Sequence, residues 1–427
     1  MNRFPRSMVA AIAALMACSS ESTGTIQISL GGEADALTRA PAPTTLVVES
    51  IGTDGAVTQL SRTKLPASTI DLPALDPATV GSLRITGIDD ANVTRVLGNT
   101  LPFQFGALSG SSLEIFVQRV GEFARLPSPF AVPFSLPVTT AVVGRYLFTA
   151  SGNASQVYDL LALSALANPP TLPRAALSVA ASSTKVLLID ASGATWFDLS
   201  DSSSSEMSPP PGGTFAEVAG GATVIGEDGS AYIVGATRST APSSRVLVLK
   251  TDGSFAFASL SSERMAASAT WIGGRGLAVA GGSTTGAGVE ILAPGSSLAA
   301  PLAYPADAAR GAGALPVDAT HLLLVGGGAG IRSVDLACAA ACAPTPWTAE
   351  LPFELANVDV FPLAGQTNEW MVLGSDANGA SRAVQLVAGT TREIPLRVPR
   401  VGARMMPLPT GGVVVVGGAT DIESFVP

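Results

Sequence analysis

Two cysteines and the only histidine of the chain carry the side chains most suited to a metal or redox centre. Cys338 and Cys342 lie close together in an alanine-rich segment, and His321 precedes them. No further cysteine or histidine lies nearby to complete a ligand set. An oxidising compartment joins such a pair, so we expect a local disulfide with a short loop. We expect no metal or cofactor, and we interpret His321 as a packed or hydrogen-bonded residue at the start of a strand.

Arginines recur at one position of a repeated segment, roughly 16 or 17 residues before a turn of small residues, as Arg174, Arg264, Arg310 and Arg400. Equivalent positions in a circular repeat lie at equal radius and height, so these guanidinium groups are expected at one end of a central channel, with Arg404 beside them. Because a guanidinium binds carboxylates and sulfates through a planar fork, such a ring would form an anion site. The alternative is that each arginine bonds loop carbonyls or a carboxylate of the adjoining repeat.

No residues are predicted to be catalytic. Asp159, Asp198 and Asp335 recur at repeat-related positions, which lie in different structural units and can be structural. The segment Asp190–Trp196 resembles the Asp-box turn of sialidases, but Leu188 replaces the serine of that box, the spacing from aspartate to glycine is longer and there is a single copy. That box is a structural turn in any case. The sequence contains no Ser-His-Asp set and no phosphate-binding loop.

The elements that must position these residues are repeated strands, which begin after residue 121. One apolar strand type that ends in small residues recurs roughly every 40 to 48 residues. Each unit begins with one strand, continues with the apolar copy and a further strand, and ends with a less regular outer strand. Four strands of this kind make one blade of a propeller. The copies are Tyr146–Gly152, Lys185–Ala191, Tyr232–Ala236, Gly276–Gly282, His321–Gly327, Trp370–Ser375 and Val413–Gly418.

The two ends of this repeated region complete one another. The last unit stops at Pro427 without an outer strand, whereas Glu122–Pro127 is similar to the outer strand expected at Trp347–Pro352 and has no unit before it. We therefore expect the strand at 122–127 to close the ring and leave no open edge. This predicts a seven-bladed propeller over residues 121–427.

The repeats resemble the bacterial kelch family, whose propellers are similar to the central domain of galactose oxidase. Apolar residues run into a glycine pair at Gly281-Gly282, Gly326-Gly327 and Gly417-Gly418, and a strand such as Gly288–Leu292 follows. The resemblance implies a kelch-like propeller fold, and secreted members include copper radical oxidases. Their copper needs paired histidine and tyrosine ligands, whereas this chain has 1 histidine and 4 tyrosines. The copper site is therefore excluded.

The N-terminus has the features of an export signal. Arg3 and Arg6 precede an apolar run from Met8 to Ala17, which at roughly ten residues is half of what a membrane-spanning helix needs. Leu15-Met16-Ala17-Cys18 resembles the bacterial lipobox, which implies a lipoprotein signal peptide at 1–17 and a lipid on Cys18; ordinary secretory cleavage near this point is the alternative. Ser19 resembles the residue found in Gram-negative lipoproteins sorted to the outer membrane.

A separate domain is expected between this signal and the repeats. Residues 18–23 would form a lipidated tether, and residues 24–120 contain about seven short β-rich runs separated by turns, which fits a small immunoglobulin-like β-sandwich. The sandwich would lift the propeller off the membrane. The acidic turns Gly52–Gly55 and Asp89–Asn92 lack the dense oxygen ligands of a calcium loop, so we interpret them as plain turns.

Composition agrees with an exported all-β protein. The chain contains 45 Gly and 31 Pro, 47% hydrophobic and 13% charged residues, and a net charge of −9, which repels a phosphate backbone. Nucleic acid is therefore excluded as a partner. We expect a monomeric cell-envelope lipoprotein, bound to the membrane through its lipid, whose propeller is a binding or scaffold module for protein or glycan and is not an enzyme. The alternative is a secreted propeller enzyme, glycan-active, sialidase-like or oxidase-like, whose site cannot be identified from single residues.

Overall fold

The computed structural model describes residues 24–427 except residues 109, 135–136, 329, 366–367 and 388. The expected signal peptide, the tether and Cys18 lie outside the described residues. The described part is all-β, with short 3-10 helices at Phe105–Leu108 (η1), Phe215–Glu217 (η2) and Gly235–Thr237 (η3). In this part of the chain, no helix combines the length and apolar character needed to cross a membrane.

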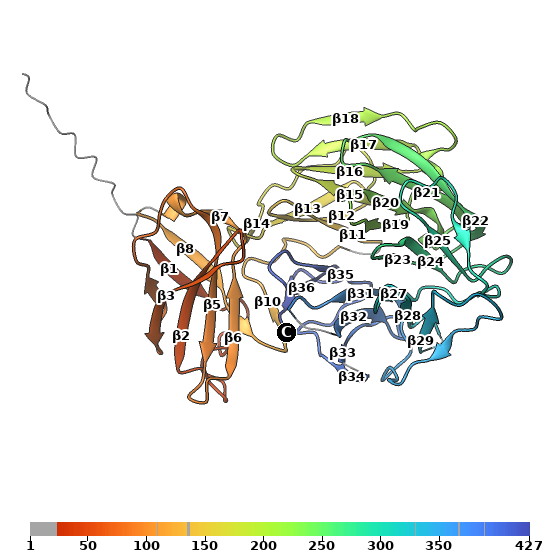
Figure 1. The fold of residues 1–427 in the computed structure, drawn as a ribbon. Helices are drawn as coiled ribbons and strands as arrows, with labels where there is room; N and C mark the ends of the chain where they lie inside the picture. Colours follow the sequence, from red (N-terminus) through yellow and green to blue (C-terminus); the bar gives the residue numbers. More distant parts are fainter. Residues whose placement is uncertain (1–23, 109, 135–136, 329, 366–367, 388) are drawn as a thin grey trace, which may run out of the picture.

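Residues before 120 form two sheets around one hydrophobic core (Figure 1). The smaller sheet has the strand order β4-β1-β8, and the larger has the order β3-β2-β5-β6-β9 with β7 paired to β5. Ile26, Leu46, Ile85 and Ile115 from the two sheets share the core. The strands are β1 (Thr25–Ser29), β2 (Thr45–Gly52), β3 (Val57–Lys64), β4 (Thr69–Asp71), β5 (Val80–Ile88), β6 (Thr94–Asn99), β7 (Phe103–Gln104), β8 (Ser112–Phe116) and β9 (Gln118–Arg119).

The remaining described residues form seven four-stranded antiparallel sheets. The first strand of each sheet contacts the first strand of the next, and β35 contacts β11, so the sheets make a ring, which is a β-propeller (Figure 1). The first three sheets are β11 (Thr139–Val143), β12 (Tyr146–Ser151), β13 (Ala154–Asp159) and β14 (Ser164–Ala165); β15 (Ser178–Ser182), β16 (Lys185–Asp190), β17 (Gly193–Asp198) and β18 (Ser204–Met207); and β19 (Ala222–Ile225), β20 (Ala231–Val234), β21 (Ser243–Leu249) and β22 (Phe255–Arg264).

The other four sheets continue the ring in chain order, and the last of them takes in the early strand β10. They are β23 (Ser268–Ile272), β24 (Gly276–Ala280), β25 (Val289–Leu292) and β26 (Ala300–Pro301); β27 (Gly313–Pro316), β28 (His321–Val325), β29 (Ile331–Asp335) and β30 (Thr345–Pro346); β31 (Ala356–Pro362), β32 (Glu369–Ser375), β33 (Ser381–Val387) and β34 (Thr390–Glu393); and β35 (Arg404–Pro407), β36 (Val413–Val416), β37 (Glu423–Phe425) and β10 (Phe123–Arg125).

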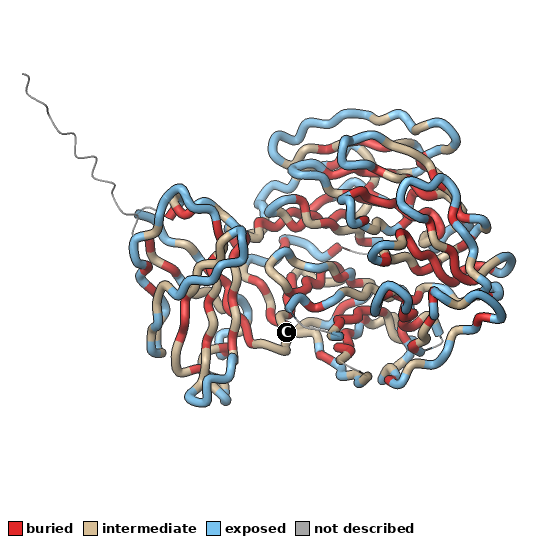
Figure 2. Tube along the Cα trace, viewed as in Figure 1, coloured by how far each residue is buried: buried red, intermediate tan, exposed pale blue. Residues whose placement is uncertain are grey.

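Each of the seven repeat copies found in the sequence lies on the second strand of a sheet, and these strands are the most deeply buried (Figure 2). β24 and β36, for example, are buried along their whole length. A strand in this position packs against a neighbouring sheet on both faces, so its side chains are apolar throughout instead of alternating. This arrangement accounts for the high hydrophobic content of a chain with few charges.

The ring is closed by the early strand β10. It pairs antiparallel with β37, and Phe123 lies opposite Phe425 in the register. Both side chains are fully buried, and their ring centroids are 5.4 Å apart. The segment that follows the sandwich is therefore the outer strand of the last sheet.

The glycine pairs mark turns that no other residue fits easily. Gly281 and Gly282 have φ angles of 73° and 67°, in the left-handed region. A Cβ on Gly282 would lie 2.4 Å from the backbone oxygen of Met265, and one on Gly418 would lie 2.6 Å from the backbone oxygen of Val401. These turns bring the end of the second strand against the chain that enters the same blade.

Aspartates stabilise many of the other turns. Oδ1 of Asp54 accepts the N–H of Ala56, and Oδ1 of Asp89 accepts those of Ala91 and Val93, at 2.9–3.0 Å. No group of His, Cys, Asp or Glu within the described residues is arranged to hold a metal ion. The acidic turns of the sandwich therefore act as Asx turns.

Candidate functional site

Two of the recurrent arginines, Arg264 and Arg400, are held inside the blades. The side chain of Arg264 is 0% exposed, and its Nη2 lies 2.7 Å from Oε1 of Glu290, which is also 0% exposed. Its Nη1 donates to the carbonyl oxygen of Gly281, the first residue of the glycine turn, at 2.9 Å. Arg264 ends the outer strand of one sheet and Glu290 belongs to the next, so the pair links neighbouring blades.

Arg400 repeats this arrangement in the last blade. Its Nη2 lies 3.0 Å from Oε1 of Glu423, with both side chains 0% exposed, and its Nη1 donates to the carbonyl oxygen of Gly417 at 3.0 Å. Glu423 occupies the same register position as Glu290, opposite the next-to-last residue of the second strand. Each of these two blades therefore contains its own buried Arg–Glu pair, in the same arrangement.

The pKa of Glu290 reflects two opposing effects. Burial alone raises the pKa of Glu290, but the hydrogen bonds that it accepts from Arg264 and from Ser261 and Ser262 lower it, and the net pKa is below its usual value. A buried charge of this kind is tolerated because it is paired and hydrogen-bonded. No free ligand reaches either guanidinium.

Two further arginines are also paired with carboxylates. Arg174 contacts Asp190 at 2.8 Å and Glu206 at 2.5 Å, and its own side chain is 10% exposed. Arg404 binds both oxygens of Asp359 on the neighbouring β31, at 2.7 and 2.9 Å. These contacts match the alternative to the anion site, in which the arginines pair with carboxylates of the protein itself.

Arg310 is the exception, because its blade has no glutamate at the position of Glu290 and Glu423. It is exposed and forms no ion pair with any described residue. Arg332 occupies the position in β29 that Glu290 occupies in β25, and it pairs with Asp307 at 2.9 Å. Because Arg332 is positively charged, it cannot pair with Arg310, and the Arg310 side chain is exposed to solvent instead.

The predicted anion ring is therefore wrong. Arg174, Arg264, Arg400 and Arg404 each have a carboxylate partner already, and the side chains of Arg264 and Arg400 are fully buried. One remaining exposed arginine in an acidic protein does not form a ring of positive charge. The structure thus offers no support for an anion site built on this repeat.

The other residues singled out by the sequence have structural surroundings. Cys338 and Cys342 form a disulfide, as predicted, with an S–S distance of 2.07 Å. His321 is exposed, and its Nδ1 lies 3.0 Å from Oδ2 of Asp318. Asp190, in the segment that resembles an Asp box, accepts the backbone N–H groups of Ser192 and Gly193.

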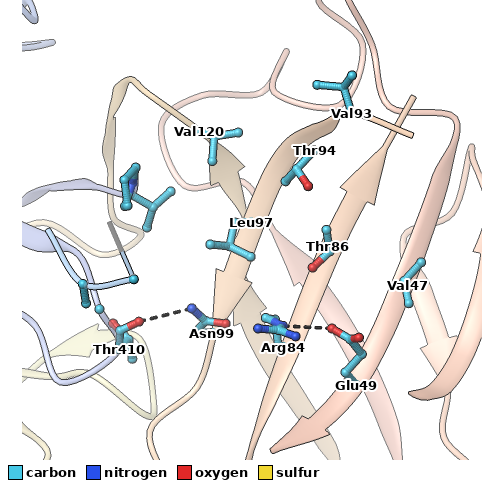
Figure 3. A pocket seen from close by; sticks show the side chains of 15 residues that line it. Val47, Glu49, Arg84, Thr86, Val93, Thr94, Leu97, Asn99, Val120 and Thr410 are labelled. Atoms are coloured by element: carbon cyan, nitrogen blue, oxygen red, sulfur yellow. Dashed lines mark hydrogen bonds and ion pairs between the residues drawn. The ribbon is translucent and has the colours of Figure 1, made fainter. Parts of the chain in front are cut away.

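A different place brings polar groups of both domains together: an open cleft of about 880 Å³ between the sandwich and the propeller (Figure 3). Small-molecule pockets have volumes of about 300–1,000 Å³. One wall is the outer face of β2, β5 and β6. The other wall consists of the turns after β31 and β35, at Ala364-Gly365 and Thr410-Gly411, together with Val426.

The alternation of β5 explains this face. Leu83 and Ile85 point into the sandwich core, so Arg84 and Thr86 point to the opposite side, toward the propeller. The register places Glu49, Arg84 and Asn99 side by side across three strands. The adjacent row is Val47, Thr86 and Leu97. The wall therefore has a polar row next to a mostly aliphatic row.

Several polar atoms of the first row are free to bind. Arg84 donates from Nε to Oε2 of Glu49 at 2.8 Å, and among the described residues its two terminal nitrogens make no hydrogen bond (Figure 3). Asn99 donates from Nδ2 to the carbonyl oxygen of Thr410 at 3.2 Å. Its Oδ1 is buried and accepts no hydrogen bond from any described residue. Because this oxygen is buried, the atoms left for a ligand are the terminal nitrogens of Arg84 and the second carboxylate oxygen of Glu49.

The two walls are fixed to each other by contacts around the domain junction. Oε2 of Glu122 accepts one hydrogen bond from Nη2 of Arg39 in the sandwich, at 2.7 Å. It accepts a second from Nη2 of Arg397 in the propeller, at 2.5 Å. The hydroxyl of Ser424 on β37 donates to Gln118 on β9. Phe116 of the sandwich packs into a hydrophobic cluster of the propeller. The cleft is therefore preformed.

This cleft could not be predicted from the sequence. Arg84 and Thr86 have the alternation of any solvent-facing side of a strand, and the turns opposite them come from the other end of the chain. The one available signal was the position of the closing strand, which ties residues just after the sandwich to the last blade. It implies that the sandwich lies beside that blade.

Comparison with known proteins identifies no family for the chain. No family model matches the chain, and no curated protein matches it. Among solved structures, the WD40 domain of Neurospora crassa Pan2 has 12% identity and a TM-score of 0.45 over 71% of this chain and 94% of that one. The WD40 β-propeller domain of Doa1 has 12% identity and a TM-score of 0.49 over 70% and 95%. PorZ, a surface component of the type-IX secretion system of Porphyromonas gingivalis, has 11% identity and a TM-score of 0.31 over 88% and 57%.

Proposed function

We propose that this protein is a monomeric cell-envelope lipoprotein that binds an envelope protein or glycan and does not catalyse a reaction. In this proposal, a lipid on Cys18 holds it to the outer membrane of a Gram-negative bacterium. An immunoglobulin-like sandwich carries a seven-bladed kelch-like propeller, and the cleft between them is the ligand site.

The observation that carries the binding role is the preformed cleft with its unpaired polar atoms. Its walls come from two domains that are fixed together, and its ionic pair, Arg84 with Glu49, has unused hydrogen-bonding atoms on the cleft side. Preformed sites lose little entropy on binding. The seven sheets and the glycine turns at Gly282 and Gly418 support the kelch-like assignment.

Cross-linking from the cleft tests the binding role. A photoreactive amino acid in place of Leu97, inside the cleft, is expected to give a discrete cross-linked product in producing cells. The matched control replaces Leu298, which is 61% exposed on the blade of β23–β26 and outside the cleft. Products of equal yield from both positions, or none from Leu97, would contradict a ligand site in the cleft.

The membrane anchor has its own test. Cys18→Ser is expected to abolish incorporation of labelled palmitate and to move the protein from the membrane to the soluble fraction, because the lipid supplies the membrane affinity while the protein surface is acidic. The Cys338→Ala/Cys342→Ala double variant keeps Cys18 and should label normally. Membrane retention of the Cys18→Ser variant without label would defeat the proposal.

A further inference from the structure

We propose that the ligand of the interdomain cleft is a neutral oligosaccharide, held by the pair Glu49 and Arg84 and packed on the neighbouring row of Val47, Thr86 and Leu97. This inference rests on the proposed function of the cleft as a ligand site and goes further by naming the chemical class.

The first argument is that side chains, not backbone, must hold the ligand. A peptide that adds to a sheet needs a free strand edge. The cleft instead lies on a sheet face, where β2 is paired with β3 and β5, and β5 is paired with β2 and β6. The backbone groups of these two strands are used within the sheet. Recognition by strand addition is therefore closed on this wall.

The second argument concerns hydrogen bonding. A sugar hydroxyl donates one hydrogen bond and accepts others at the same time. The polar row presents an acceptor at Oε1 of Glu49 and donors at the terminal nitrogens of Arg84. Neighbouring strands are about 4.8 Å apart, so these groups follow one another at short intervals across the sheet. Adjacent hydroxyls of one sugar can satisfy them together.

The third argument concerns charge. Arg84 is neutralised by Glu49 at 2.8 Å, so these two side chains together carry no net charge. The chain as a whole has a net charge of −9, which disfavours an anionic ligand. Beside the polar row, Val47 and Leu97 offer an aliphatic surface for the C–H face of a sugar ring, and the hydroxyl of Thr86 lies between them. The wall thus matches an uncharged ligand with a polar edge and an apolar face.

The experiment uses the purified full chain and an array of neutral hexose and N-acetylhexosamine oligosaccharides, with acidic oligosaccharides on the same array. Hits are then titrated calorimetrically. Wild-type protein is expected to bind at least one neutral oligosaccharide and to prefer neutral over acidic ones. Thr86→Val, which removes one hydroxyl at nearly constant volume, and Arg84→Met should each raise Kd about tenfold or more, because a site built for hydrogen bonds loses affinity when a partner is removed.

Thr58→Val and Arg310→Met are the matched controls, since both residues are exposed and outside the cleft. They should leave Kd unchanged, and circular dichroism should show all four variants folded. No binding of any neutral oligosaccharide, preference for acidic ones, or equal Kd values for cleft and control variants would overturn the inference. If cross-linking from Leu97 succeeds while the array is empty, the cleft remains a ligand site and only the glycan assignment fails.

Discussion

Replacing Arg264 with methionine is expected to lower the free energy of unfolding by about 3–5 kcal/mol, because Glu290 would remain buried without its counter-charge. Both side chains are fully buried, and the arginine also donates to the carbonyl oxygens of Gly281 and Gly288. Urea unfolding monitored by tryptophan fluorescence gives the measurement. Arg310→Met is the matched control, since Arg310 has the same repeat position but is exposed and forms no ion pair with a described residue; its change should stay within about 0.5 kcal/mol.

The double variant Arg264→Met/Glu290→Met tests whether the loss of stability comes from leaving the Glu290 charge buried without a partner. Replacing both charges with apolar side chains is expected to recover most of the stability, because no buried charge is left alone. If Arg264→Met destabilised the protein no more than Arg310→Met, the buried pair would not hold the blades together.

Phe123→Ala is expected to lower the free energy of unfolding by about 3–5 kcal/mol, the cost of removing a fully buried phenylalanine. Phe123 belongs to the closing strand and packs on Phe425 of β37 at a centroid distance of 5.4 Å. The closing contact joins the two ends of the ring, so the loss should appear in the unfolding of the whole propeller.

A double-mutant cycle with Phe425→Ala provides the control. If the two rings support one another in closure, their effects should be non-additive by about 0.5–3 kcal/mol. Strict additivity, or an unchanged unfolding midpoint in Phe123→Ala, would show that β10 does not lock the ring.

The inner strands of the propeller were predictable because burial on both faces leaves a strong signal. A continuous apolar run followed by glycines, as in Gly276–Gly282, has few other interpretations, and the positive φ angles of Gly281 and Gly282 give the physical reason. The closing strand was predictable by matching its sequence to an outer strand. Outer strands themselves were not: the one expected at Trp347–Pro352 is the short β30, Thr345–Pro346, because an exposed edge strand places little demand on its side chains.

The candidate sites, in contrast to the inner strands, could not be predicted from the sequence. Arginines were aligned by position along the chain, but their environment depends on the residue across the strand, which is glutamate at Glu290 and Glu423 and arginine at Arg332. The single-position pattern could not distinguish a buried ion pair from a ring facing the channel. The cleft depends on which turns of the last blades face Arg84 and Asn99, and that juxtaposition arises only from the closed ring.

The pairing of β10 with β37 also fixes the order in which the chain can fold. β10 emerges before every other described propeller strand, yet its partner is β37, so this contact must wait until β37 has been synthesised. Contacts between distant segments pay the largest loop-closure entropy and form slowly. Until they form, β10 lacks its partner and an edge of the unfinished ring is open to pairing with other chains. A chain truncated before Glu423 would therefore be a substrate for aggregation and proteolysis instead of a smaller stable propeller.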